Sequence, residues 1–178
     1  RKTCRHTDDD LRWLIALISD SGMRLAEAAG LLKADIQLDH EIPHVSLKPH
    51  AWRQLKTANS ERVMSLVGTS LWAVRCILEC TDTEFAFPLF TNATRCNSNS
   101  ASATLNKWMK PLVPHGCVFH SFRHSLRDRL RAVETPSEIA DVLGGWTSKS
   151  ISQSYGKGYD LPVLRRWMKR LEQYSSSD

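Results

Sequence analysis

The sequence lacks the cysteine patterns that stabilise secreted proteins or bind zinc. Its five cysteines are odd in number, include no Cys-x-x-Cys pair and have no spacing typical of a zinc site. We therefore expect a reduced, intracellular protein whose cysteines are buried thiols. Cys76 and Cys80 are four residues apart, which predicts that both pack into the core from one face of a helix.

Segments that would direct the chain to a membrane are also absent. Residues 1–20 contain no signal-peptide pattern, and the apolar stretch from Leu11 to Ile18 is short and interrupted by Arg12. The sequence has no internal repeat and no low-complexity domain. With 178 residues, of which 42% are hydrophobic, it is predicted to form one soluble domain around one sizeable core.

The beginning of the sequence suggests that this domain is part of a longer chain. The first residue is Arg1 rather than Met, and a helical pattern starts within the first ten residues. We therefore expect that an N-terminal domain is missing.

Basic residues outnumber acidic residues, 24 to 19, and the net charge of +5 is compatible with a polyanionic partner. The basic side chains are concentrated in two segments, which contain Arg123, Arg127, Arg129 and Arg131, and Arg165, Arg166, Lys169 and Arg170. The alternative interpretation is that each segment is the solvated face of a helix.

The first third of the sequence predicts two helices followed by strands. A helix is expected to start after the Thr7–Asp10 cluster and to end at Ser21-Gly22, and a second is expected over Arg24–Lys33. Short β-prone runs follow between turn residues, and they predict a small antiparallel sheet. These runs are Ile36–Leu38, Val45–Leu47 and Val63–Leu66.

The remaining residues return to helical spacing. Apolar residues between Leu71 and Leu78 and between Leu105 and Leu112 predict two helices, separated by a polar surface loop over Thr91–Ser102 with no chemistry of its own. Later helices are expected over residues 120–132, 136–143, 148–156 and 161–172, with Pro136 and Pro162 at helix starts. The predicted fold class is mainly α with a small antiparallel β-sheet, an α+β domain.

Several short motifs contain residues suited to phosphate chemistry. His120 and Arg123 are three residues apart at a predicted helix start. Trp146 follows a Leu-Gly-Gly run about 20 residues later, and Tyr155 lies nine residues beyond it. Far upstream, Arg24 lies in the run Ser-Gly-Met-Arg-Leu-Ala-Glu.

In this order, the motifs resemble those of the tyrosine recombinases of the phage-integrase type. Members carry an arginine in a Thr-Gly-x-Arg-x-x-Glu setting, a lysine on a β-hairpin, His-x-x-Arg, then His or Trp, and then the nucleophilic tyrosine. The matching positions here are Arg24, Lys56, His120, Arg123, Trp146 and Tyr155. The resemblance covers nearly the whole chain and implies the catalytic-domain fold of that family.

The resemblance assigns each of these residues a chemical role. Arg24 and Arg123 can each present two parallel N–H donors to the scissile phosphate, which a lysine cannot do. Lys56, whose alternative is a solvated hairpin lysine, is implied as the general acid that protonates the departing 5′ oxygen. His120 can move a proton to or from the tyrosine or a phosphate oxygen, and which of these it does is left open.

Trp146 and Tyr155 complete the implied site. Trp146 occupies the position where most relatives have His; it can donate its indole N–H but cannot shuttle a proton, and its alternative role is core packing. Tyr155 is implied as the nucleophile that forms a 3′-phosphotyrosyl link. Tyr159 is the rival, and only the spacing from Trp146 selects Tyr155. Glu27, one turn after Arg24, is expected to orient that arginine, and no metal or other cofactor is expected.

The segment His40-Glu41-Ile42-Pro43-His44 matches the H-E-x-x-H pattern of zinc proteases. That pattern binds zinc only when both histidines lie on one face of a helix. Pro43 disfavours a helix here, so we do not assign a metal site.

The resemblance implies a site-specific recombinase that integrates or excises a phage or other mobile element in the bacterial cytoplasm, associated with the nucleoid. Its expected partners are duplex DNA with specific attachment sites and, as a homotetramer, further copies of itself. Apolar residues over Leu161–Leu171 favour exchange of a C-terminal segment between copies, with packing on its own domain as the alternative. The rival functions are a type IB topoisomerase and a catalytically silent DNA-binding module.

Overall fold

The computed structural model describes residues 9–57, 60–146 and 159–176. The first half contains α1 (Asp10–Ser21), α2 (Leu25–Ala29), the 3-10 turn η2 (Lys33–Asp35), β1 (Ile36–Gln37), β2 (His44–Leu47), β3 (Arg62–Ser65) and α3 (Gly68–Cys80). The second half contains α4 (Ser98–Met109), the 3-10 turn η4 (Lys110–Leu112), α5 (Ser121–Ala132), α6 (Ser137–Gly144) and α7 (Leu161–Ser176). The helices and the sheet confirm the mainly α class with a small sheet.

The three strands form one antiparallel sheet in the order β1-β2-β3. Val45 at the centre pairs with Ile36 on one side and with Met64 on the other. All three side chains are buried on the same face, because residues paired across a sheet project to the same side. The sheet therefore contributes one face to the core, as the β-prone runs predicted.

Helix α1 lies at the centre of the main core. Its N-cap is Asp9, whose carboxylate accepts the Arg12 backbone N–H at 3.0 Å, and its C-cap is Gly22, which adopts a left-handed φ of 63°. Its residues from Trp13 to Ser21 are all buried, packed against α3 and α5. The predicted start and stop of this helix are confirmed.

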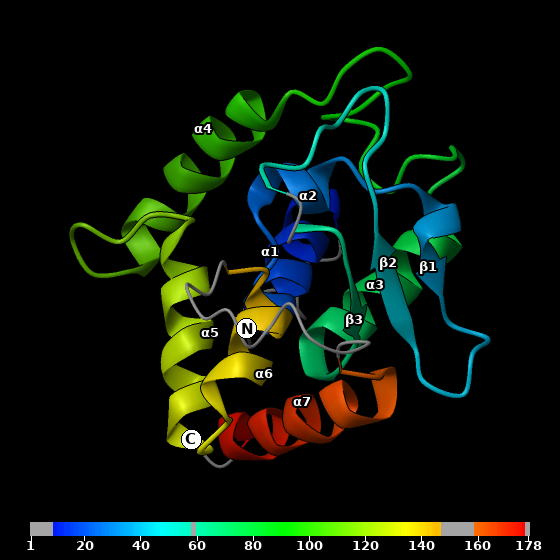
Figure 1. Cartoon of the computed structure of the whole chain (residues 1–178). Helices are drawn as coiled ribbons and strands as arrows, with labels where there is room; N and C mark the ends of the chain where they lie inside the picture. Colours follow the sequence, from blue (N-terminus) through cyan, green and yellow to red (C-terminus); the bar gives the residue numbers. More distant parts are fainter. Residues whose placement is uncertain (1–8, 58–59, 147–158, 177–178) are drawn as a thin grey trace.

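A second cluster of apolar residues joins α5, α6 and α7, which are grouped in the lower part of Figure 1. Leu164, Met168 and Leu171 of α7 are buried against Leu126 and Leu130 of α5. In this structure the apolar stripe of α7 thus packs on its own domain. Within the described residues, no helix is both long enough and apolar enough to span a lipid bilayer.

The second helix is shorter than predicted, because it ends at Ala29 rather than Lys33. Beyond Gly30, the chain turns to pair with another segment: the Ala86 N–H donates to Leu31 O at 2.9 Å and the Lys33 N–H donates to Glu84 O at 2.8 Å. These long-range bonds replace the local helical ones.

Two further expectations are wrong. The Thr91–Ser102 loop includes the first turn of α4, whose cap is Asn97; its side chain accepts the Ser100 N–H at 3.2 Å. Cys80 is exposed at the end of α3 rather than packed in the core, and Cys117 is exposed as well. The helix expected over residues 148–156 lies outside the described residues.

Candidate active site

Arg24 follows the left-handed turn at Gly22 and occupies the N-cap position of α2. Its guanidinium Nη1 donates to Glu27 Oε1 at 2.6 Å and to Ser60 Oγ at 2.7 Å. The backbone N–H of Arg24 also donates to Glu27 Oε2, at 2.9 Å. Glu27 therefore orients Arg24, as its spacing predicted, and 22% of the Arg24 side chain stays exposed.

Glu27 is buried and is shared with a second arginine that the sequence did not single out. Arg62 of β3 donates from Nη2 to Glu27 Oε2 at 3.1 Å, and both side chains are only 4% exposed. Burial alone would raise the pKa of Glu27, but the charge of Arg62 and the hydrogen bonds from Arg24 outweigh it and lower the pKa. Glu27 is thus held as a carboxylate between two guanidinium groups.

Arg123 projects from the first turn of α5 and is 4% exposed. Its Nη1 donates to Gly22 O and its Nη2 to Gly144 O, the latter at 2.7 Å. Burial and the nearby charge of Arg24 lower the pKa of Arg123 to about 10. The side chain consequently remains a cation at neutral pH.

The C-terminal end of α6 receives hydrogen bonds from three arginines. The acceptors are the carbonyl oxygens of three consecutive residues, Leu143, Gly144 and Gly145. Their donors are, in order, Arg62 Nε at 3.3 Å, Arg123 Nη2 at 2.7 Å and Arg24 Nη2 at 3.3 Å. Carbonyls at a helix C-terminus have no partner within the helix and carry partial negative charge. This helix end therefore holds three cations from three different elements close to one another.

Trp146 follows directly after this helix end. Gly145 adopts a left-handed φ of 59°, and the Trp146 N–H donates back to Asp141 O at 2.9 Å, which completes a Schellman-type cap. A Cβ on Gly144 would lie 2.1 Å from the indole ring, so glycine at 144 gives the ring its space. The Arg123 guanidinium lies 5.1 Å from the centroid of the Trp146 ring. Trp146 therefore lies beside Arg123, while its ring also packs against the second core cluster.

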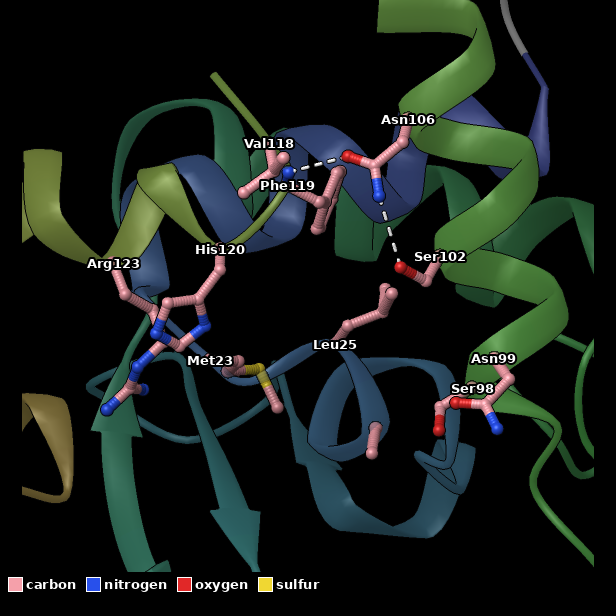
Figure 2. Close-up of a pocket in the computed structure, with 11 residues that line it drawn as sticks. Met23, Leu25, Ser98, Asn99, Ser102, Asn106, Val118, Phe119, His120 and Arg123 are labelled. Carbon is pink, nitrogen blue, oxygen red and sulfur yellow. Dashed lines mark hydrogen bonds between the residues drawn. The ribbon is translucent and has the colours of Figure 1, made fainter. Parts of the chain in front are cut away.

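His120 precedes α5 and is exposed, with its ring 5.4 Å from that of His124. Together with Arg123 it lines one end of a pocket of about 260 Å³ (Figure 2). Partial desolvation of the ring and the positive charges around it, led by Arg123, lower the pKa of His120 below its ordinary value. Its imidazole is therefore favoured in the neutral form, which can accept a proton.

The other side of this pocket is a polar face of α4. Figure 2 shows Ser102 of that helix across from Leu25, and Asn106 pointing toward Phe119. The Asn106 side chain accepts the Phe119 N–H at 2.7 Å and donates to Ser102 Oγ at 3.1 Å. Asn106 thereby connects α4 to the segment that enters α5 at His120.

Lys56 is exposed on the hairpin between β2 and β3. Its charge is one of those that lower the pKa of His120, so the hairpin brings it within electrostatic range of that imidazole. Two residues hold the hairpin against α2: Trp52 Nε1 donates to Gly30 O at 3.1 Å, and Arg53 Nη1 donates to Glu27 O at 2.7 Å. These contacts fix the hairpin three and four residues before Lys56.

Comparison with known proteins shows the family to which the chain belongs. The sequence model of the phage integrase family matches residues 2–160. The chain belongs to the phage integrase family. No curated protein matches it by sequence.

The chain is similar in fold to solved structures of integrases and recombinases. One is the Tn1549 transposon integrase in complex with a circular intermediate DNA, with a TM-score of 0.59 and 15% identity over 90% of this chain and 58% of that one. A second complex of this integrase gives a TM-score of 0.57, 14% identity and coverage of 89% and 57%. The XerH site-specific recombinase bound to difH substrate gives 0.54, 16% identity and coverage of 98% and 49%. The chain therefore spans about half of the length of these proteins.

Of the two tyrosines considered for the nucleophile, the structure describes Tyr159. Tyr155 lies outside the described residues. The Tyr159 hydroxyl donates to Glu138 Oε2 at 2.8 Å, and this hydrogen bond raises the pKa of Tyr159. Glu138 lies in the first turn of α6, whereas the arginines gather at its last turn. Tyr159 is thus engaged at the opposite end of the helix from Trp146.

The basic segment on α5 is largely paired within the protein. Arg129 is bonded to Asp20 at 3.0 Å and to Ser19 O, and Arg131 pairs with Asp128 at 3.1 Å. Neither interpretation from the sequence, a polyanion-binding patch or a solvated face, describes Arg129, because its side chain is 12% exposed. The H-E-x-x-H match is likewise not on a helix, because His44 begins strand β2.

Proposed function

We propose that this chain is the catalytic part of a site-specific DNA recombinase that cleaves and rejoins strands through a 3′-phosphotyrosyl intermediate formed on Tyr155. The observation that carries the proposal is the convergence of Arg24, Arg123 and Trp146 on one helix end, with His120 beside them. Membership of the phage integrase family supports it. Integration or excision of a phage or other mobile element is the task that we infer.

The cleavage step transfers one phosphoryl group and needs no external energy. The Tyr155 oxygen attacks the phosphorus, the bond from phosphorus to the 5′ oxygen breaks, and the 5′ oxygen takes up a proton. We assign the donation of that proton to Lys56 and the removal of the tyrosine proton to His120, whose lowered pKa favours the neutral base. A 5′ hydroxyl from a second strand reverses these steps and restores the tyrosine.

Negative charge on the phosphate is balanced by fixed cations in this scheme. Arg24 and Arg123 are held by carbonyls and by Glu27 before substrate arrives, so little reorganisation accompanies the reaction. Trp146 supplies one N–H donor and an apolar wall. Loss of one such preorganised donor costs roughly 3 kcal/mol of transition-state stabilisation, which is about a hundredfold in rate.

Duplex DNA carrying attachment sites is the proposed substrate, and a homotetramer on paired sites is the proposed assembly. The similar structures described above are complexes of an integrase and a recombinase with DNA, which supports the first point. A type IB topoisomerase would share the cleavage chemistry, and a silent DNA-binding module would share only the fold. The full set from Arg24 to Tyr155 favours an active enzyme over the silent module.

The first test is a covalent adduct with DNA. The full-length protein is incubated with nicked duplex DNA from the ends of its own element, and the protein–DNA adduct is resolved by denaturing electrophoresis. We expect an adduct with the wild type and with Tyr159→Phe, and none with Tyr155→Phe. An adduct that persists in Tyr155→Phe and disappears in Tyr159→Phe would reverse the assignment of the nucleophile.

The role of Lys56 is tested with a substrate in which sulfur replaces the bridging 5′ oxygen. A thiolate leaves without protonation, so Lys56→Ala should cleave this substrate at close to the wild-type rate while failing on normal DNA. Lys48→Ala, in the same hairpin region, is the matched control and should cleave both substrates. Equal impairment of Lys56→Ala on both substrates would show that Lys56 is not the general acid.

A further inference from the structure

Arg127 lies one helical turn after Arg123 on α5, and its guanidinium is 4.8 Å from the centroid of the Trp146 ring. The Arg123 guanidinium lies 5.1 Å from the same centroid. Both distances are within the range in which a cation is attracted to an aromatic face. The indole is therefore held by two cations from one helix, of which only Arg123 belongs to the motifs identified in the sequence.

Asp141 of α6 connects Arg127 to the backbone of Trp146. Arg127 Nη2 lies 3.3 Å from Asp141 Oδ1, and the Asp141 side chain is 13% exposed. The carbonyl of Asp141 accepts the Trp146 N–H at 2.9 Å. The backbone of Asp141 thus contacts the backbone of Trp146 directly, and its side chain contacts Arg127, which lies against the indole ring. This arrangement restricts both the backbone and the side-chain rotamer of Trp146.

The indole packs directly against the backbone of Gly144, where a Cβ would lie 2.1 Å from the ring. The ring also packs against the second core cluster. Arg127 adds a cation to these apolar contacts, at 4.8 Å from the ring centroid.

We propose that Arg127 is a positioning residue that, together with Asp141, holds the Trp146 indole beside Arg123. The inference rests on the proposed function for its catalytic consequence, but the position of the indole can be measured without DNA. The competing explanation is that Arg127, which is 41% exposed, contacts a DNA phosphate. Substitution of Arg127 should change the position of the indole if Arg127 positions Trp146, and the affinity for DNA if Arg127 contacts a phosphate.

The DNA-free test uses the full-length protein labelled with 5-fluorotryptophan, with the Trp146 resonance assigned from Trp146→Phe. We expect Arg127→Met to shift and broaden the Trp146 fluorine signal while the signals of Trp13 and Trp72 stay in place. Arg131→Ala, which removes an exposed arginine from the same helix, should leave the Trp146 signal unchanged. An unmoved signal in Arg127→Met would overturn the proposal.

The kinetic test measures single-turnover cleavage of nicked attachment-site DNA alongside DNA affinity as a function of salt. We expect Arg127→Met to slow cleavage about tenfold with an unchanged Kd, and Arg127→Lys to recover part of the rate. A raised Kd, a reduced salt slope and an unchanged rate would instead identify a phosphate contact and overturn the positioning role.

A double substitution separates a specific contact from general damage. In a Trp146→His background the ring that Arg127 contacts is gone, so adding Arg127→Met should cause little further loss. A full additional tenfold loss in that background would contradict the proposal. If the wild type itself forms no adduct, the proposed function fails, whereas the fluorine experiment still decides whether Arg127 positions Trp146.

Discussion

Replacement of Gly145 by alanine tests the packing at the end of α6. The residue has a left-handed φ of 59°, and a Cβ there would lie 2.6 Å from Arg62 Nη1 and 2.9 Å from Arg62 Cζ. Arg62 has little room to move, because it is buried and donates to Ser60 O at 2.8 Å, to Glu27 and to Leu143 O. The added methyl group must therefore displace a buried, paired guanidinium.

The expected cost has two parts. An alanine in the left-handed region costs about 1–2 kcal/mol. Disrupting a buried ion pair on one side, here Arg62 with Glu27, costs about 3–5 kcal/mol. The sum of about 4–7 kcal/mol is a large share of a domain's usual stability of about 5–15 kcal/mol.

Urea unfolding followed by circular dichroism measures this cost. Gly116→Ala is the matched control, because Gly116 has a φ of 88° and no atom lies within 4 Å of its added Cβ, so only the conformational part should appear. In an Arg62→Ala background, the further effect of Gly145→Ala should fall to the control value. If Gly145→Ala destabilises the native chain no more than Gly116→Ala does, the reasoning about Arg62 is wrong.

Three other substitutions or titrations follow from the site. Glu27→Gln should lower the free energy of unfolding by about 3–5 kcal/mol at neutral pH. Because the native pKa of Glu27 is lowered, its stabilising contribution is present above the unfolded value near 4.5 and disappears as pH falls. Urea unfolding should therefore show the variant and the native protein converging in acid, and a constant difference between them would contradict this. Asp20→Asn breaks the buried ion pair with Arg129, which costs about 3–5 kcal/mol, and should lower the unfolding midpoint in calorimetry by roughly 6–20 °C. An unchanged midpoint would exclude a stabilising pair. The pKa of His120 should lie below the ordinary value of 6.5 in histidine NMR spectra, so protonation of His120 destabilises the folded state and stability rises with pH between the folded and the unfolded pKa. Lys56→Gln should raise the pKa of His120. An unchanged pKa would place Lys56 out of electrostatic range of the imidazole.

Local pattern was a reliable guide to most elements. Asp9 and Gly22 define the ends of α1 through capping preferences that depend only on neighbouring residues. Short β-prone runs predicted the three strands and the antiparallel sheet that they form. The order of the motifs from Arg24 to Tyr155 predicted the family that the match over residues 2–160 shows.

Elements that depend on distant partners were predicted less well. Helix α2 stops early because residues 31–33 pair with residues 84–86, more than 50 positions away. The start of α4 lies in a Ser- and Asn-rich stretch that composition assigns to a loop, although Asn97 as a cap was a usable signal. The exposure of Cys80 depends on which elements pack against α3, and the spacing of residues within a helix does not predict those elements.

By itself, the sequence determined most of the helices and the small sheet, and it supplied the residues proposed for phosphate chemistry. Only the tertiary structure decided what holds them: Arg123 is bonded to Gly22 O across 101 positions, and Arg24 to Gly145 O across 121. Arg62 reaches Leu143 O and Arg127 reaches the Trp146 ring for the same reason. Capping and periodicity act between neighbours in the chain, whereas carbonyl acceptors and ring contacts arise only when packing brings helix ends together.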